Sequence, residues 1–140
     1  MQILFLTPEI SVAPQIDPGD LAAVAAAGFR AVINNRPDGE VSGQPSDAQM
    51  QAAAAASGLA YVFLPVISGG LQMSDVTDFG AAMAQLPKPV LAFCRSGTRS
   101  STVWALSAVG SGTDPQVVLA ATRQAGYNLD PALLQAHYKS

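Results

Sequence analysis

The stretch Val90-Leu-Ala-Phe-Cys-Arg-Ser-Gly-Thr-Arg-Ser100 decides the fold and the chemistry of this 140-residue chain. A short apolar run ends on Cys94, the only cysteine, and turns through Gly97 toward a predicted helix. In a strand, turn and helix of this kind, backbone N–H groups converge on the turn and the helix adds its positive N-terminal end. Arg95 and Arg99 add two full charges, which favours the thiolate form of Cys94. We therefore expect Cys94 to be a nucleophile in an anion-binding loop.

The residues around Cys94 provide the predicted site. We expect Arg99 to act with Cys94 in catalysis by facing the substrate anion, and Arg95 to lie at the rim. The residues assigned to substrate binding are Arg95, Ser96, Gly97, Thr98, Ser100 and, from another loop, Arg36. The alternative is a structural cysteine, since free cysteines are among the most buried residues. A structural cysteine would not call for two arginines, a glycine and several hydroxyl groups in the next positions.

The composition fits one domain over residues 1–140, because 49% of the residues are hydrophobic and only 12% are charged. A net charge of −3 argues against a nucleic-acid or anionic-membrane surface. One cysteine allows no internal disulfide and suits a reducing compartment. We find no signal peptide or membrane span, so a cytoplasmic location is expected. His137 has no ligand-type neighbours at suitable spacing and is predicted to be a surface residue, so we expect neither metal nor cofactor.

Strand-like and helix-like segments alternate along the chain. This order predicts an α/β domain with a central, mainly parallel sheet of four to five strands flanked by helices. The predicted strands are residues 3–6, 10–12, 31–34, 60–64 and 89–93. The predicted helices begin after Asp17-Pro18, at Ser46, at Ser74, near Arg99, at Asp114-Pro115 and at Asp130-Pro131.

Loops at the carboxyl ends of parallel strands line the ligand crevice, so loops beginning near Asn34, Pro65 and Cys94 should meet there. We expect Cys94 to be exposed at the floor of this crevice. The first loop contains Arg36, Asp38 and Glu40, which could contact a substrate or hold a neighbouring loop through an ion pair. Asp75 and Asp78 fall in the first turn of a predicted helix, where acidic residues complement the helix dipole.

Three motifs in this order carry a family resemblance. They are Ser11-Val-Ala-Pro-Gln15, Gly28-Phe-Arg-Ala-Val-Ile-Asn-Asn-Arg-Pro-Asp-Gly-Glu40 and Cys94-Arg-Ser-Gly-Thr-Arg-Ser100. Nearly the whole chain resembles a bacterial family known both as beta-lactamase-hydrolase-like phosphatases and as sulfur transferases. The resemblance implies the fold of dual-specificity cysteine phosphatases. Members occur alone or joined to a metallo-beta-lactamase-like persulfide dioxygenase, which the resemblance therefore suggests as a partner.

The resemblance leaves two enzyme activities to separate. Cysteine phosphatases place one more residue between cysteine and arginine than this chain, which has four there. The sequence Cys-Arg-Ser-Gly-Thr-Arg-Ser instead looks like the active loop of single-domain rhodaneses, whose tighter ring suits a persulfide. The amino-terminal half, however, lacks the strand and acidic-loop pattern of a true rhodanese. The body of the chain thus resembles a phosphatase and the loop resembles a sulfurtransferase.

The general acid is the second distinction. A phosphatase needs a carboxylic acid to protonate the departing oxygen, whereas transfer of a sulfane sulfur between thiolates does not. The region where these phosphatases usually have that aspartate reads Tyr61-Val-Phe-Leu-Pro-Val-Ile-Ser68, without an acid, and Phe93 replaces their usual histidine. Asp38 or Asp75 could substitute only if their loops folded over Cys94.

The sequence therefore favours a sulfurtransferase. Cys94 would move a sulfane sulfur from thiosulfate or a glutathione-type persulfide to a thiol acceptor such as glutathione, through a Cys94 persulfide. The alternative enzyme is a cysteine-dependent phosphatase of the dual-specificity or tyrosine-phosphatase class, acting through a Cys94 phosphoenzyme. A non-enzymatic protein that only binds an anion in the same loop is the third hypothesis.

Overall fold

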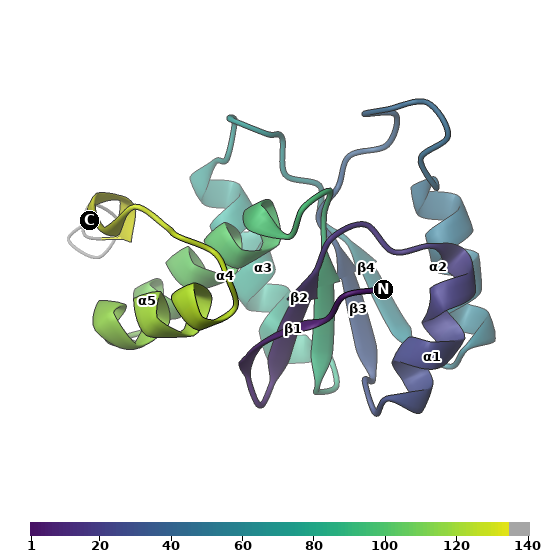
Figure 1. Cartoon of the computed structure of the whole chain (residues 1–140), viewed down its shortest axis with the longest axis horizontal. Coiled ribbons are helices and arrows are strands. Elements are labelled where there is room, and N and C mark those ends of the chain that lie inside the picture. The colour runs from purple at the N-terminus through teal and green to yellow at the C-terminus, as the bar shows by residue number, and fades with distance from the viewer. Residues whose placement is uncertain (135–140) are drawn as a thin grey trace.

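The computed structural model describes residues 1–134 and contains the mainly parallel sheet that the sequence predicts (Figure 1). Its strands are β1 (Leu4–Thr7), β2 (Ile10–Ala13), β3 (Ala31–Asn34), β4 (Ala60–Phe63) and β5 (Val90–Phe93), in the order β1-β2-β5-β3-β4. Only β1 is antiparallel to its neighbour. The fully buried apolar residues of β3 and β5 explain their place at the centre of the sheet, since a parallel strand covered on both faces must be apolar throughout.

Helices cover both faces of this sheet (Figure 1). One face packs against α3 (Met73–Gln85), α4 (Thr98–Gly110) and α5 (Pro115–Gln124) around Phe79 and Leu106. The other packs against α1 (Leu21–Ala26) and α2 (Asp47–Ala56) around Met50 and Phe93. The two faces of β5 serve different cores because successive side chains of a strand point in opposite directions: Val90 and Ala92 enter the first core, Leu91 and Phe93 the second.

The predicted caps agree with the structure in most places. Ser46 accepts a hydrogen bond from the backbone of Gln49 at the start of α2, and Asp114 accepts one from Gln116 at the start of α5. The prediction that Ser74 caps α3 is wrong, because α3 begins at Met73, one residue after Gln72. A short 3-10 helix, η1 (Pro18–Asp20), precedes α1. Residues 131–134 are helical as expected after Asp130, and His137 lies outside the described residues.

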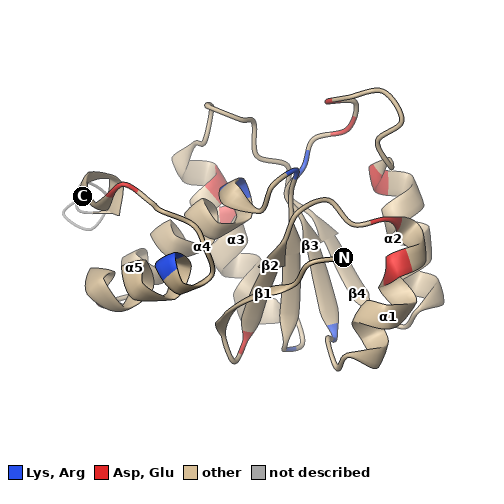
Figure 2. Ribbon diagram, in the orientation of Figure 1, with Lys and Arg blue, Asp and Glu red and all other residues tan. Residues whose placement is uncertain are grey.

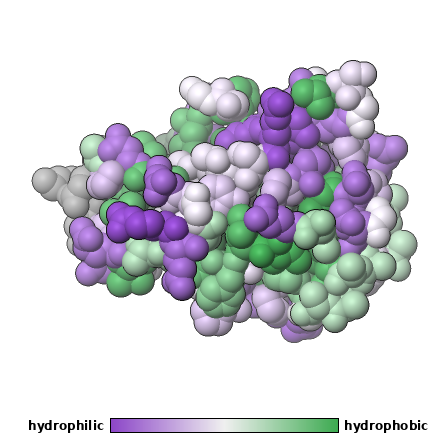
Figure 3. Space-filling view, viewed as in Figure 1, coloured by the Kyte–Doolittle hydropathy of each residue, from purple (hydrophilic) through white to green (hydrophobic). Residues whose placement is uncertain are grey.

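The strand register brings the expected loops together. Phe93 at the end of β5 pairs with Ala13 on one side and with Asn34 on the other, and Asn34 also pairs with Phe63. Four strands therefore end at the same level, and the loops that follow them share one edge of the sheet. Basic residues gather at this edge with acidic residues in the adjacent loop (Figure 2), whereas apolar side chains gather over β1 on the viewed face (Figure 3).

Candidate active site

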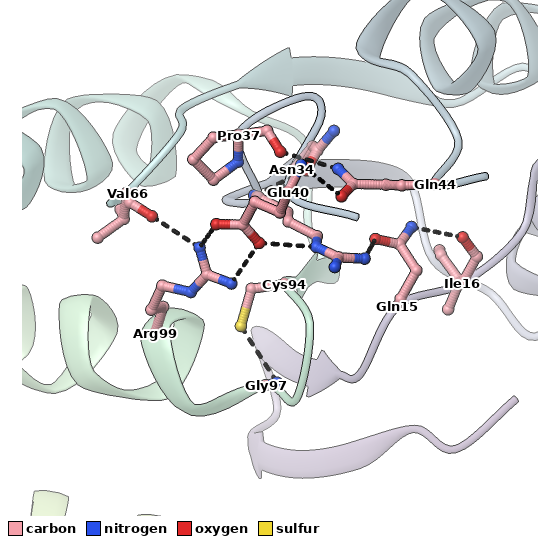
Figure 4. A network of polar contacts seen from close by, with 11 residues as sticks. Gln15, Ile16, Asn34, Pro37, Glu40, Gln44, Val66, Cys94, Gly97 and Arg99 are labelled. Atoms are coloured by element: carbon pink, nitrogen blue, oxygen red, sulfur yellow. Dashed lines mark hydrogen bonds and ion pairs between the residues drawn. The ribbon is translucent and has the colours of Figure 1, made fainter. Parts of the chain in front are cut away.

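The Cys94 loop, residues 94–98, joins β5 to α4 at this edge. Gly97 has a φ of +90°, a left-handed conformation that favours glycine, and it is the N-cap of α4. The turn directs the Gly97 N–H at the sulfur of Cys94, with an N–Sγ distance of 3.1 Å (Figure 4). The strand, the glycine turn and the helix thus produce the backbone donor that the sequence predicts.

The carbonyl groups of the Cys94 loop are held by other segments. The Arg95 carbonyl accepts a hydrogen bond from the Gln15 N–H at 3.1 Å, and the Gly97 carbonyl accepts one from the Ser101 N–H within the helix at 3.0 Å. Between them, the Ser96 carbonyl accepts a hydrogen bond from the Tyr127 hydroxyl at 3.0 Å. Three consecutive carbonyl dipoles are therefore satisfied away from the sulfur. This arrangement leaves the Gly97 N–H, which points at the sulfur, to face a negative charge.

Cys94 itself is fully buried, with 0% of its surface exposed, so the prediction of an exposed thiol at the crevice floor is wrong. The reason is that side chains from neighbouring loops cover the position above the strand end. Figure 4 shows Arg99 and Glu40 lying beside Cys94. Because Cys94 has no exposed surface, a substrate does not reach the sulfur in this conformation.

An ion-pair network forms the cover. Arg99 donates from Nη1 to Glu40 Oε2 at 2.7 Å and from Nη2 to Glu40 Oε1 at 2.9 Å, a bidentate contact. Arg99 Nη1 also donates to the Val66 carbonyl at 2.9 Å, which ties the loop after β4 to the site. On its other side, Glu40 accepts from Arg36 Nε at 2.8 Å. The sequence left two roles open for Glu40, contact with a substrate or an ion pair that holds a neighbouring segment. The structure shows the ion pair.

This network fixes the charge of Glu40. The hydrogen bond from Arg99, aided by the one from Arg36 and opposed by partial burial, lowers the pKa of Glu40 from 4.5 to about 2. Conversely, the hydrogen bond with Glu40 raises the pKa of Arg99, and negative charge on Cys94 acts in the same direction. At neutral pH the site therefore holds two guanidinium groups and one carboxylate, a net positive charge beside the sulfur.

A cavity of about 470 Å³ opens next to the Cys94 loop. Its polar wall contains Arg95, Ser96, Thr98 and Arg99, and its apolar wall includes Val66 and Leu133. Arg95 is exposed at the rim, where the sequence placed it, and the Ser96 hydroxyl donates to that of Thr98 at 2.9 Å. A larger cavity of about 630 Å³ shares no residue with this loop and is lined in part by the turn between β1 and β2. The smaller cavity is therefore the substrate-binding candidate.

Three predicted substrate-binding residues do not line this cavity: Gly97, whose N–H points at the sulfur, Ser100 and Arg36. Ser100 is fully buried, and its hydroxyl donates to Asn35 Oδ1 at 2.8 Å, because the first turn of α4 directs it toward the loop after β3. Arg36 is 4% exposed and donates to Glu40 and, from Nη1, to Gln15 Oε1 at 3.0 Å. In this structure Ser100 connects α4 to the loop after β3, and Arg36 connects that loop to Gln15, so their contact with a substrate stays a prediction.

The two aspartates considered as substitute acids have other roles. Asp38 Oδ1 accepts the backbone N–H of Asp47 at 2.7 Å, at the start of α2. Asp75 Oδ2 accepts the backbone N–H of Gln72 at 2.8 Å, at the start of α3, in agreement with its predicted role at a helix terminus. Neither loop brings its carboxylate to the Cys94 loop.

Several residues that support the site were not identified from the sequence. Gln15 and Asn35 lie within the motifs noted above, but their partners are far along the chain. Asn35 donates from Nδ2 to the Leu64 carbonyl at 2.9 Å while it accepts from Ser100, so it joins the loop after β3 to the loop after β4 and to α4. Tyr127 had no local signal, because its contact with Ser96 spans 31 positions. The sequence did offer one signal for Asn35, because a polar residue directly after a buried strand is expected at the edge of the sheet where the site lies.

The structure shows no binding site for a metal ion within residues 1–134, since no group of three or more His, Cys, Asp or Glu side chains converges there. Over the same residues, no helix is long and apolar enough to cross a membrane.

Comparison with known sequences identifies relatives over most of the chain. Residues 2–111 match the family described as beta-lactamase hydrolase-like protein, phosphatase-like domain. A beta-lactamase hydrolase-like protein of Agrobacterium fabrum is 37% identical over 106 residues, which are 76% of this chain and 25% of the relative. One of Xylella fastidiosa is 38% identical over 112 residues, 80% of this chain and 26% of the relative. The chain spans about a quarter of the length of these curated relatives.

Solved structures share the fold. A "putative phosphatase" from Neisseria meningitidis is 31% identical, with a TM-score of 0.87 over 98% of this chain and 99% of that one. The kinase associated phosphatase, with its catalytic-site cysteine changed to serine, has a TM-score of 0.78 at 13% identity over 99% of this chain and 92% of that one. These findings confirm the cysteine-phosphatase fold and indicate an enzyme of the phosphatase-like class. They support the phosphatase alternative and give no support to the sulfurtransferase prediction.

Proposed function

The chain belongs to the family of the phosphatase-like domain of beta-lactamase hydrolase-like proteins. From the residues of its candidate site we propose that it transfers a sulfane sulfur through Cys94. In this proposal the phosphatase-like fold is the scaffold and the transferred group is sulfur. Donors are thiosulfate or a glutathione-type persulfide, and acceptors are low-molecular-weight thiols.

The main support for this proposal is the position of the carboxylates relative to the Cys94 loop. Hydrolysis of a phosphate ester by a cysteine nucleophile calls for an acid that protonates the departing oxygen. All ten Asp and Glu residues lie within the described part of the chain, and none of them lines the cavity beside the Cys94 loop. Glu40 comes to the site, but the two arginines hold its pKa at about 2, so it has no proton to donate at neutral pH. Sulfur transfer between thiolates needs no such proton.

The width of the loop supports the same conclusion. Four residues separate Cys94 from Arg99, and the Gly97 N–H lies 3.1 Å from the sulfur. A tight ring of this kind suits a single additional sulfur atom bearing negative charge. Backbone donors that face this charge stabilise the persulfide as they would an oxyanion.

The proposed reaction proceeds in two steps. The Cys94 thiolate attacks the outer sulfur of thiosulfate, a bond forms between the two sulfurs, and the bond to the sulfonate group breaks with its electron pair leaving as sulfite. The acceptor thiolate then attacks the outer sulfur of the Cys94 persulfide, and the Cys94 thiolate departs. Once Glu40 is displaced, Arg99 is free to bind the anionic donor, and the exposed Arg95 provides additional positive charge at the rim.

A cysteine-dependent phosphatase is the second candidate, and the comparisons favour it. The family description and the 31% identical structure both carry the phosphatase name. In that reaction the Cys94 thiolate would take the phosphoryl group and water would release it. An acid would then have to reach the departing oxygen by a rearrangement of the loops around Glu40.

A direct comparison of the two activities on one sample tests the proposal. We expect steady-state release of sulfite from thiosulfate with a thiol acceptor, and little hydrolysis of an aryl phosphate. Cys94→Ser is the matched control, because it removes the nucleophile and changes one atom. Cys94-dependent aryl-phosphate hydrolysis without sulfite release would refute the proposal and establish the second candidate. Phosphate binding retained by Cys94→Ser, with neither activity in the native protein, would establish an anion-binding protein.

A further inference from the structure

Tyr127 lies outside the part of the chain that matches the family, yet it contacts the Cys94 loop. The segment after α5 turns back toward the start of α4 (Figure 1), and the half-buried Tyr127 donates its hydroxyl hydrogen to the Ser96 carbonyl at 3.0 Å. The family match ends at residue 111, before α5 begins. The Cys94 loop is therefore supported by a side chain that enters from the C-terminal region.

The bond made by Tyr127 acts on the peptide group that faces the sulfur. The Ser96 carbonyl and the Gly97 N–H belong to one peptide unit, which is planar and places these two groups on opposite sides. Tyr127 holds the carbonyl end, and the N–H end lies 3.1 Å from Cys94 Sγ. Fixing one end of a planar group fixes the direction of the other. The Tyr127 hydroxyl is thus coupled to the donor at the sulfur without touching the sulfur.

The Tyr127 hydroxyl occupies the space that a side chain at position 97 would need. A Cβ atom at position 97 would lie 2.0 Å from the Tyr127 hydroxyl oxygen and 2.9 Å from its Cζ. Glycine is therefore required here both by the left-handed φ of +90° and by the space that Tyr127 occupies. The two residues form a matched pair.

The other carbonyl bonds of the loop come from main-chain donors. Gln15 and Ser101 hold the Arg95 and Gly97 carbonyls through their backbone N–H groups. A side-chain substitution leaves those donors in place, whereas it can remove the Tyr127 hydroxyl. Burial raises the pKa of Tyr127, and negative charge on Cys94 adds to the effect, so the hydroxyl stays protonated and able to donate.

We propose that Tyr127 is a positioning residue, which orients the Ser96–Gly97 peptide so that its N–H group stabilises negative charge on Cys94. It does not contact the reacting atoms. The assignment holds whether Cys94 accepts a sulfur or a phosphoryl group, because it concerns the thiolate before either reaction begins. It therefore stands or falls independently of the function proposed above.

The test is the pH profile of Cys94 alkylation by iodoacetamide in Tyr127→Phe, which removes the hydroxyl and keeps the ring. Cys94 is the only cysteine, so the signal belongs to it alone. We expect the midpoint of the profile to move upward, because the thiolate loses an aligned donor. At pH values below the midpoint the alkylation rate should fall about 5- to 10-fold, the effect expected of one net hydrogen bond.

Tyr61→Phe is the matched control. The Tyr61 hydroxyl is also half-buried and bonded, to Asp47 at 2.6 Å and to Asn34 at 3.0 Å, but neither partner belongs to the Cys94 loop. We expect Tyr61→Phe to lower the thermal unfolding midpoint without moving the alkylation profile. A profile of Tyr127→Phe that coincides with that of the native protein would overturn the proposal, and so would an equal shift in both variants.

A double-mutant cycle tests the pairing of Tyr127 with Gly97. Gly97→Ala is expected to slow alkylation more in the native background than in Tyr127→Phe, because the closest clash is with the hydroxyl oxygen. Part of the cost remains in both backgrounds, since the positive φ and the contact with Cζ persist. Purely additive effects on the alkylation rate would contradict the proposed pairing.

Discussion

Two loops meet over Cys94, and they are held in different ways. Backbone hydrogen bonds and one tyrosine fix the Cys94 loop, and Gly97 gives it a shape that most residues cannot adopt. The loop after β3 is held to α4 by side chains, through the bond of Glu40 to Arg99, and the bond of Glu40 to Arg36 lies within that loop. The first loop thus has a fixed shape with the Gly97 N–H on the sulfur, and the second is a cover whose strength depends on charge. Arg99, in the first turn of α4 directly after the Cys94 loop, binds the second.

The largest effect should come from removing Arg99, where the two loops join. Arg99→Ala is expected to lower kcat/KM for sulfur transfer by about 10²- to 10³-fold, the usual cost of losing a donor at a developing negative charge. Arg95→Ala is the matched control in the adjacent Cys94 loop, because Arg95 is exposed at the rim, and we expect a loss of about 3-fold or less. Steady-state kinetics with thiosulfate distinguish the two variants. A larger loss in Arg95→Ala would mean that the loop binds its substrate from the other side.

A smaller effect is expected when the cover alone is weakened. Glu40→Gln keeps the size of the side chain but removes the charge that binds two arginines, so the fully buried Cys94 should become accessible more often. We expect iodoacetamide to alkylate Cys94 about 3- to 10-fold faster, because partly exposed ion pairs each contribute up to about 1 kcal/mol.

Asp75→Asn is the control for Glu40→Gln. It removes the same charge from the start of α3 and should leave the alkylation rate unchanged. If both variants behaved alike, general charge rather than the cover would govern access to Cys94. If Glu40→Gln were slower than the native protein, Glu40 would support Arg99 rather than shield the sulfur.

The smallest expected effect is on stability in acid. The folded-state pKa of Glu40 lies at about 2, below its ordinary value of 4.5. Its contribution to the free energy of unfolding is therefore complete above pH 4.5 and is lost as the pH falls from there toward about 2. Urea unfolding across this range should show a shallower loss of stability in Glu40→Gln than in the native protein. Parallel curves would show that the ion pairs do not stabilise the fold.

The sequence predicted the fold because its signals are local. Apolar runs before Asn34 and Cys94 mark the central strands, and serine and proline mark most helix starts. The Ser74 cap was wrong because Gln72 and Asp75 form an equally local alternative, in which the Asp75 carboxylate accepts the Gln72 N–H. The cysteine loop and its glycine were also readable, since a strand, a turn and a helix follow one another without interruption.

The parts of the site that could not be predicted depend on contacts between distant residues. Arg99 and Glu40 lie 59 positions apart, and Ser100 and Asn35 lie 65 apart. A motif indicates which residue types occur in a loop but not which way a hydroxyl or guanidinium group points. For this reason the motifs did not show that Ser100 binds Asn35, or that Arg36 binds Glu40 and Gln15. The burial of Cys94 likewise follows from the cover, which no local pattern reveals.

The central claim is that Cys94 accepts a sulfane sulfur, and the mass of the peptide that contains Cys94 tests it most directly. The protein is exposed to thiosulfate without an acceptor, and half of the sample then receives glutathione. Both halves are digested, and the mass of the peptide that contains Cys94 is measured in each. We predict a gain of one sulfur atom on Cys94, its disappearance on addition of glutathione, and no gain in Cys94→Ser. An unchanged Cys94 peptide in a protein that hydrolyses aryl phosphates through the same cysteine would contradict the account.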